Sequence, residues 1–402
     1  MRSRRADLDA PAIGIVSANL RVELLDSGDA ARNEARDREL DEFFEACPTS
    51  FAQQTRHWRD VIAPLAGDEP LFLVARDPTR GHSLVGVLPS YRFAGRLGAV
   101  LNSVPQAGPL GGVAVAAGVE AEPVYRALLG AYVELGRSTK CAAVSVISNP
   151  FWPDLHFYRR HLEPEFTLRN DCLALDLEKQ VDADGGFPAG SSHLRRNLRK
   201  ARAAGLRVEE GHTPEEIAAW YEIHAARHHA LHATPLPQAM FSGALRHMVP
   251  RGKARFFLVR DPGEGDRLLA GGFYILHGRV IDALMPAVSA AGAERGANYL
   301  LAEHTIHWAR ARGLRFYNWQ GSPPAGGVQR FKQQWGSSEF RYCYFTRVTG
   351  DIEPLLSSTP AAVRDAYPWH FTLPFDAIGQ PGAHRGGNHS RRAAWKAADS
   401  GR

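Results

Sequence analysis

Asp282, His228 and Lys332 have the types and settings that suit acid–base or electrostatic catalysis in this 402-residue chain. Asp282 lies inside the apolar run 280–285, where a carboxylate requires either a partner or a catalytic task. A general base and a salt-bridged structural aspartate are equally good interpretations. His228 follows His224 by four residues, a spacing that also suits a metal, but no H-E-x-x-H pattern completes such a site. We therefore expect no metal and consider His228 an acid–base candidate.

A polar and aromatic cluster closes the run 314–319, which predicts a strand. Asn318 and Gln320 are amides at the end of this strand, where a binding cleft is expected, and they could orient an amide product. Tyr317 belongs to the same cluster, although aromatic residues in such positions are more often part of the core. These three residues are candidates for substrate binding.

The elements that must position these residues form a repeat. Each copy reads as two apolar strands joined by an Asp-Pro turn, followed by a helix and a further strand. The first copy comprises strands 72–78 and 84–93, helix 123–137 and strand 141–148. The second copy comprises strands 257–262 and 268–276, helix 297–312 and strand 314–319. Because the order of the elements repeats together with the pattern, we interpret the chain as a duplicated β-β-α-β unit.

A basic helix is predicted between the copies, over 191–204, with no acidic residue. Leu194, Leu198 and Ala201 form the apolar stripe that would dock it. Cations at helix spacing repel one another, and a bound anion relieves that cost, so a polyanion site is favoured over a solvated face. No base-reading motif accompanies the helix, so sequence-specific recognition is not indicated. The predicted residues for binding a polyanion, such as the phosphates of a nucleotide, a coenzyme or RNA, are Arg195, Arg196, Arg199, Lys200 and Arg202.

Composition limits the classes of protein to which the chain can belong. With 44% apolar and 23% charged residues, the chain is folded, and its length suggests two domains. No apolar run approaches the roughly 18 residues of a membrane span. Four cysteines lie far apart without a C-x-x-C pair, which fits a reducing, cytoplasmic location. The net charge of +5 is concentrated in 191–207 and in the tail from Gly379, whereas the rest of the chain is mildly acidic.

Together these patterns resemble the FemAB-like branch of the GNAT N-acyltransferases. The shared features are the tandem β-β-α-β repeat, a basic segment that opens the second unit, and a closing strand with an F-K-x-x-W-G motif. In the first unit, 51–53, Trp58 and the loop 108–112 are similar to the substrate-facing segments of the family. The matching stretches of the second unit are 196–205, 278–279, 297–301, 317–322 and 327–336.

The resemblance implies an α+β fold of two tandem GNAT-like domains, each a mixed sheet with flanking helices. An amine acceptor would bind on the side of the first domain, where Gln53 and Trp58 would contact it. The implied organisation is a flexible segment 1–20, an acceptor-side domain 21–165, a donor-side domain 166–355 with the basic helix 191–205, and a C-terminal extension 356–402, disordered from about 379.

The resemblance also places Lys332 near the ester carbonyl of the donor. An ammonium there stabilises the oxyanion that forms during attack by the amine, an effect of about 3–4 kcal/mol for one good donor. Phe331 and Trp335 flank this lysine and would bind substrate and exclude water. The alternative is a surface lysine at the end of a strand.

The implied activity is amide formation, in which the amine of a natural-product or cell-wall precursor attacks an activated acyl group. The donor is aminoacyl-tRNA in some family members and acyl-CoA in others. The basic helix and the lack of a strict Q/R-x-x-G-x-G/A pyrophosphate loop favour aminoacyl-tRNA. An acyl-CoA-dependent enzyme is the alternative, and a non-catalytic RNA- or nucleotide-binding module is a second one.

Two further observations refine this expectation. The chain has no G-x-S-x-G motif and no cysteine in a nucleophile setting, so direct transfer is preferred to a covalent acyl-enzyme. The arginine that family members often have between the glycine and serine of Gly321-Ser322 is missing, which weakens the expectation of acceptor phosphate or carboxylate binding there. We expect no tightly bound cofactor.

Overall fold

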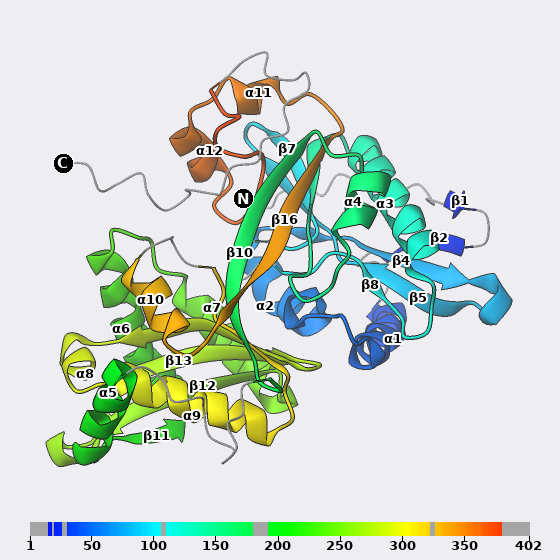
Figure 1. The fold of residues 1–402 in the computed structure, drawn as a ribbon. Coiled ribbons are helices and arrows are strands. Elements are labelled where there is room, and N and C mark those ends of the chain that lie inside the picture. Colours follow the sequence, from blue (N-terminus) through cyan, green and yellow to red (C-terminus); the bar gives the residue numbers. More distant parts are fainter. Residues whose placement is uncertain are drawn as a thin grey trace.

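Two α/β units, joined by a pair of long twisted strands, make up the protein (Figure 1). The computed structural model describes residues 15–17, 20–25, 30–105, 110–179, 192–321 and 326–379. The segment predicted to be flexible over 1–20 lies largely outside these residues. So do the tail from 380 and part of the loop 108–112.

The first unit contains four helices and most of the shorter strands. A single turn of 3-10 helix, η1 (Ala52–Gln54), lies between its first two helices. The other elements are β1 (Ile15–Ser17), β2 (Leu20–Leu25), α1 (Ala30–Ala46), α2 (Arg56–Ala66), β3 (Glu69–Pro70), β4 (Phe72–Asp77), β5 (Ser83–Leu88), β6 (Tyr91–Gly95), β7 (Gly98–Asn102), β8 (Ala114–Val115), α3 (Ala121–Ser138), β9 (Cys141–Ile147) and α4 (Leu155–His161).

The second unit lies between the two long strands in the sequence, and a short helical extension follows it. Its elements are β10 (Phe166–Asp176), α5 (Ser192–Ala203), β11 (Arg207–Glu210), α6 (Pro214–Ala230), α7 (Gln238–His247), β12 (Ala254–Asp261), β13 (Arg267–His277), β14 (Val280–Val288), α8 (Ala290–Glu294), α9 (Ala297–Ala311), β15 (Phe316–Asn318), α10 (Gly327–Gln333) and β16 (Ser338–Val348). The extension contains α11 (Glu353–Leu356) and α12 (Pro360–Ala366).

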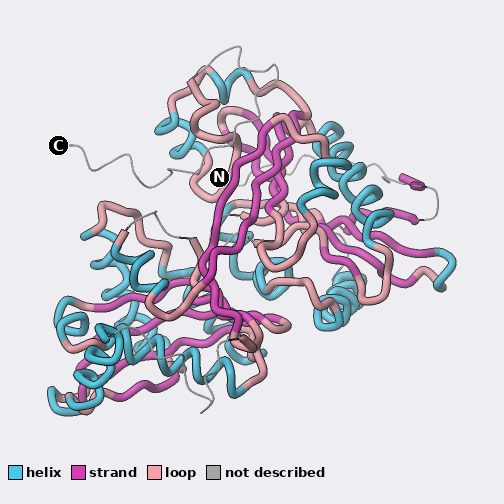
Figure 2. The backbone as a smooth tube through the Cα atoms, viewed as in Figure 1, coloured by secondary structure: helices cyan, strands magenta, loops and turns pink. Residues whose placement is uncertain are grey.

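One sheet runs through both units. Its strand order is β11-β12-β13-β14-β15-β10-β16-β9-β7-β6-β3, and a smaller sheet has the order β1-β2-β4-β5-β8. β10 and β16 form a long antiparallel ladder, visible as the tall crossing strands in Figure 2. The end of β10 pairs with β15 of the second unit, whereas the end of β16 pairs with β9 of the first. The division predicted at 165/166 therefore falls at the start of a strand that both units share.

The predicted duplication is visible in the details of the two hairpins, β4–β5 and β12–β13. A β-bulge interrupts both just before the Asp-Pro turn. The side chains of Asp77 and Asp261 accept a hydrogen bond from the backbone two residues on, and Gly81 and Gly265 end the turns at φ values of 64° and 66°. Each copy then closes with a parallel pair, β7–β9 in the first and β14–β15 in the second.

The F-K-x-x-W-G segment was predicted to be a closing strand, and this prediction is wrong. Its first part forms helix α10, and the closing strand β16 begins only at Ser338. Phe331 and Trp335 are four residues apart, so a helical turn brings both rings against Trp319, with centroid distances of 5.9 and 6.4 Å. Packing against this third aromatic ring accounts for a helix where the resemblance implied a strand.

The C-terminal extension packs on the first unit. His370 hydrogen-bonds to Asp68 at 2.5 Å, with both side chains fully buried, and stacks on Phe93 at 4.4 Å. The side chain of Asn102 donates to the carbonyl of Phe371 and accepts from its N–H, both at 2.9 Å. The extension is therefore tied to β6 and β7 by polar contacts as well as by apolar packing.

The two units also share a hydrophobic core. Trp58 and Ile62 of α2 and Met240 and Phe241 of α7 are fully buried in one cluster. Because α2 belongs to the first unit and α7 to the second, separating the units would expose these side chains to water. This shared core fixes the position of one unit relative to the other.

Candidate active site

A fork between two parallel strands forms the centre of the candidate site. β14 and β15 pair only at Val280–Asp282 with Phe316–Asn318, after which β14 continues beside β13 alone. β15 ends at this point, because Gln320 takes a left-handed backbone with φ 62° and turns the chain towards β10. Asp282 and Asn318 are the last pair before the strands separate, so the fork presents their side chains together.

Four residues that the sequence singled out separately meet at this fork. Asp282 Oδ1 accepts hydrogen bonds from the side-chain amides of Asn318 at 2.5 Å and Gln320 at 2.7 Å, and Asp282 Oδ2 accepts one from Gln53 at 3.2 Å. Gln320 is half-buried, whereas the other three are almost fully buried. The structure thus joins the predicted base to three predicted substrate-binding residues.

Asp282 makes these contacts without a cationic partner among the described residues. Burial raises the pKa of Asp282 to about 7, and the amide donors of Gln53, Asn318 and Gln320 partly oppose that rise. The observed partners are amides, so the interpretation of a salt-bridged structural aspartate does not describe this carboxyl. A buried carboxyl that titrates near neutral pH can take up and release a proton under cellular conditions.

Gln53 reaches the fork from the first unit, on the turn η1. Its neighbour Gln54 fixes that turn, because Gln54 Oε1 accepts from Phe51 N at 2.8 Å and Gln54 Nε2 donates to Gly112 O at 2.7 Å. The buried Oε1 of Gln53 has no hydrogen-bond partner among the described residues. The sequence analysis missed the role of Gln54, for which the paired glutamines in a short apolar turn were the available signal.

Lys332 lies on α10, on the opposite side of the turn that carries Gln320. Its Nζ donates to three successive carbonyl oxygens, those of Trp319 at 2.7 Å and of Gln320 and Gly321 at 3.1 Å each. The side chain is buried, so Lys332 is not a surface lysine. Its placement beside a donor carbonyl remains a prediction.

Two predicted substrate-binding residues lie in the core. Trp58 is fully buried between the units, and Tyr317 is fully buried with its hydroxyl 2.9 Å from that of Thr305 on α9. Phe331 is half-buried and Trp335 buried in the aromatic cluster behind the Lys332 turn. None of these four side chains is among the hydrogen-bond partners of Asp282 in the described structure.

The histidines of α6 are a separate cluster. His228 Nδ1 lies 2.9 Å from the carbonyl oxygen of His224, so Nδ1 carries the proton and donates. Burial lowers the pKa of His224 to about 3, which keeps that ring neutral. The structure does not bring His228 into the Asp282 cluster. The described residues include no group of three or more side chains that could hold a metal ion.

The basic helix α5 docks by its predicted stripe, Leu194, Leu198 and Ala201, which are buried. Four of the five predicted cations, including Arg195, point outward and are exposed; the fifth, Arg202, pairs with Glu303 at 2.7 Å. Within the described part of the chain, no ion pair is formed by Arg196, Arg199 or Lys200.

Contacts at the start of α5 connect this helix to α10. His193 lies 3.4 Å from both Gln334, just after α10, and the hydroxyl of Tyr299. The Tyr299 ring in turn contacts Phe331, with a centroid distance of 5.1 Å. The basic surface and the aromatic cluster behind the fork are therefore neighbours.

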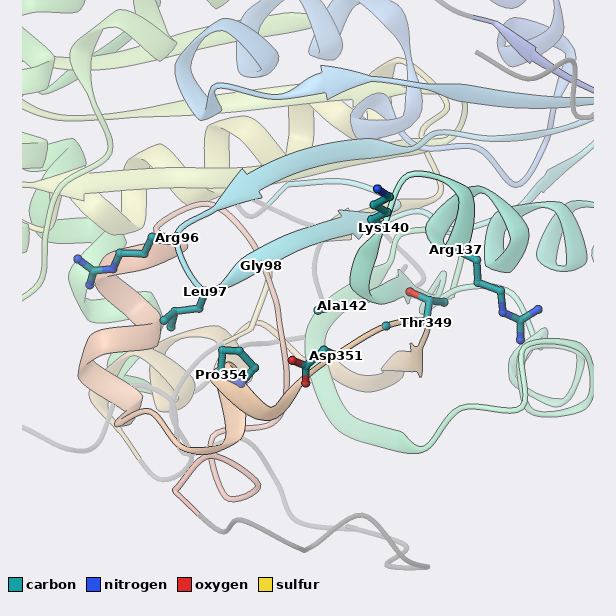
Figure 3. A pocket seen from close by; sticks show the side chains of 10 residues that line it. Arg96, Leu97, Gly98, Arg137, Lys140, Ala142, Thr349, Asp351 and Pro354 are labelled. Atoms are coloured by element: carbon teal, nitrogen blue, oxygen red, sulfur yellow. The ribbon is translucent and has the colours of Figure 1, made fainter. Parts of the chain in front are cut away.

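A separate hollow of about 570 Å³ lies behind the first unit, between the ends of β7, α3 and β16. Arg96, Arg137 and Lys140 line it, and Figure 3 shows these three side chains extending in different directions. Because they do not converge on one point, the hollow lacks the shape of an anion site. It contains none of the residues of the fork.

Residues 190–333 match the family model described as "Acetyltransferase (GNAT) domain". This part of the chain is similar to GNAT acetyltransferase domains. The matched residues include Asp282, Asn318, Gln320 and Lys332, whereas Gln53 comes from the other unit of the chain. The enzyme class predicted from the sequence, an acyltransferase, is thus confirmed.

Solved structures show how far the GNAT likeness extends. FemX has a TM-score of 0.61 at 14% identity, over 77% of this chain and 96% of its own. L-PGS from Bacillus licheniformis has a TM-score of 0.50 at 11% identity, over 77% of this chain and 90% of its own. At these identities the likeness concerns the fold, and it confirms the predicted FemAB-like arrangement of two GNAT-like units.

A search of curated protein sequences found no match to the chain. None of the helices in the described part of the chain combines the length and apolar character needed to cross a bilayer.

Proposed function

We propose that this GNAT protein transfers an aminoacyl group from aminoacyl-tRNA to the amine of a small-molecule or cell-wall precursor, by direct attack. The observation that carries the proposal is the fork itself. It holds a buried carboxyl whose pKa is raised to about 7 next to an amide oxygen, Gln53 Oε1, that has no hydrogen-bond partner among the described residues. Both are acceptors, and an ammonium group is the substrate feature that needs several acceptors.

The proton balance of such a reaction is simple. The Asp282 carboxylate takes a proton from the acceptor ammonium, and the neutral amine attacks the ester carbonyl of the donor. The tetrahedral oxyanion then collapses, the new amide bond remains, and the C–O bond to the terminal ribose of the tRNA breaks. As the intermediate collapses, Asp282 returns its proton to the departing ribose oxygen, and the second proton of the attacking nitrogen passes to water, so each turnover releases one proton.

The exposed cations of α5 support a polyanionic donor. Arg196, Arg199 and Lys200 are exposed, and α5 adjoins the aromatic cluster behind the fork. Phosphates bound on this surface would place a flexible acceptor end within reach of the fork. Binding of this kind releases counterions and weakens steeply with salt. The buried, unpaired cysteines and the tRNA donor both suit the cytoplasm, where we propose that the reaction occurs.

An acyl-CoA donor is the second candidate, and one observation favours it. The family model that matches residues 190–333 is described as an acetyltransferase domain. Transfer from a thioester would use the same carboxyl and the same proton balance, with the CoA thiol as leaving group.

The decisive experiment compares donors. The full chain is incubated with a panel of amines and either charged tRNA or acyl-CoA, with and without ribonuclease, and products are followed by mass shift. We expect amide formation with charged tRNA that ribonuclease abolishes and that falls steeply between 50 and 200 mM salt. Undiminished activity with acyl-CoA after ribonuclease treatment would instead establish the second candidate.

A further inference from the structure

The ammonium of Lys332 donates hydrogen bonds to the backbone of the turn at 319–321. Its three N–H groups meet three successive carbonyl oxygens, of Trp319, Gln320 and Gly321, at 2.7, 3.1 and 3.1 Å. Three consecutive carbonyls can converge on one point only if the chain between them is sharply turned. An ammonium is the side-chain group that has three donors and a charge to match such a set.

Gln320 supplies that turn at a conformational cost. Its φ of 62° lies in the left-handed region, where residues other than glycine are strained. Glycine would adopt this backbone without strain, but it has no side chain to reach Asp282. Asn318 Oδ1 also accepts the Gln320 N–H at 3.0 Å, so the turn is held from both sides. The strain is therefore coupled to a specific contact, the 2.7 Å hydrogen bond from Gln320 to Asp282.

We propose that Lys332 is a positioning residue that clamps the Trp319–Gly321 turn, and that the clamp sets the proton affinity of Asp282 through the side chain of Gln320. The inference rests on the proposed function, in which Asp282 is the base. It assigns to Lys332 a role different from direct stabilisation of the oxyanion, because the described geometry directs its donors to the turn.

The surroundings of Asp282 make its proton affinity sensitive to this clamp. The amide donors of Gln53, Asn318 and Gln320 lower the pKa that burial raises. The thiol of Cys172 on β10 interacts electrostatically with both Asp282 and Lys332. Burial raises the pKa of this thiol well above the neutral range. Cys172 therefore stays a neutral thiol, and loss of one amide donor acts on Asp282 directly.

The first test is the pH profile of kcat/KM in a double-mutant cycle. Lys332→Met and Gln320→Ala should each move the acidic limb to higher pH by roughly half to one unit, as expected when a carboxylate loses one hydrogen bond. The double variant should move it no further, because both changes remove the same contact. Lys179→Met is the matched control and should leave the profile unchanged.

A direct role for Lys332 makes the opposite prediction. Lys332→Met would then lower kcat by about 100- to 1,000-fold at every pH without moving the acidic limb. Its effect would multiply with that of Gln320→Ala in the double variant. That pattern overturns the clamp. If Lys332→Met fails to fold, Lys332→Arg keeps the charge but spreads its donors over a planar fork, and it permits the same comparison.

A second readout needs no substrate and so separates the clamp from the proposed function. The unfolding free energy is measured by urea titration between pH 5 and 9 for the wild type, Lys332→Met and Gln320→Ala. The clamp predicts that the fall in stability caused by ionisation of Asp282 extends to higher pH in both variants. Profiles that coincide with the wild type refute the clamp, whereas lack of transfer activity with every donor refutes only the proposed function.

Discussion

Replacement of Asp282 by asparagine should stabilise the protein at alkaline pH and inactivate it. The pKa of Asp282 is raised from 3.8 to about 7 by burial, so the folded state binds its proton more tightly than the unfolded state does. The stability that protonated Asp282 contributes is therefore fully present below the pKa of the unfolded state, 3.8. This contribution is lost as the pH rises through the folded-state pKa of about 7. The complete shift corresponds to about 4 kcal/mol, of which about 3 kcal/mol is lost between pH 5 and pH 8.

Asparagine fits this position because the cluster can rearrange around it. Its oxygen can still accept from Asn318 and Gln320, and its amide can donate to Gln53, whose Oε1 has no partner in the described structure. Urea unfolding of both proteins at pH 5 and pH 8 measures the effect. We expect the stability of Asp282→Asn relative to wild type to increase by about 3 kcal/mol between the two pH values.

Activity should change in the opposite direction. The wild-type kcat/KM should rise with pH through an apparent pKa near 7, because the carboxylate is the form that accepts a proton. Asp282→Asn should lower kcat by about 100- to 10,000-fold and abolish that limb. A stability difference that is the same at pH 5 and pH 8 would refute the raised pKa, and an active variant would refute the role as base.

Two further predictions concern surfaces away from the fork. Arg199→Ala should weaken the binding of tRNA and reduce the slope of log K against log salt by about 0.7–0.9, measured by filter binding. Arg202→Ala should change this slope less, because Arg202 pairs with Glu303. Equal effects of the two variants would contradict the assignment. His370→Ala should lower the unfolding free energy by about 3 kcal/mol, because it leaves the buried carboxyl of Asp68 without its partner, and a loss below 1 kcal/mol would show that the contact between His370 and Asp68 does not stabilise the fold.

The residues of the site could be predicted from the sequence, but the contacts between them could not. Asp282, Asn318 and Gln320 were singled out from their types and their places in strands, and Gln53 from the family resemblance. Periodicity shows which face a side chain occupies, but it carries no information on which distant turn lies opposite. The contact between Gln53 and Asp282 joins residues 229 positions apart, and only the packing of the two units creates it.

Aromatic residues were the hardest to assign from the sequence. Trp58 and Tyr317 were predicted to bind substrate, but both are fully buried in the core. A large apolar ring suits a core and a cleft equally, so its type does not distinguish them. The closing strand expected for the F-K-x-x-W-G segment came from the family resemblance, whereas Phe331 lies on helix α10 and Trp335 in the turn that follows it. The role of Lys332 depends on the backbone of Gln320, which no sequence pattern encodes.

The ladder between β10 and β16 determines whether the two units of this chain can be separated into independent pieces. A fusion of two similar units ordinarily leaves a junction at which either copy can be cut out or exchanged. Here the cut would fall inside a shared strand pair, since β16 leaves the second unit and completes the sheet of the first. A separate piece that begins at Phe166 would carry the Tyr344–Val348 edge without its partner β9, which is a template for aggregation. The two units therefore cannot be separated into independent pieces, although they share a common pattern. A substitution in either unit affects the stability of the whole chain.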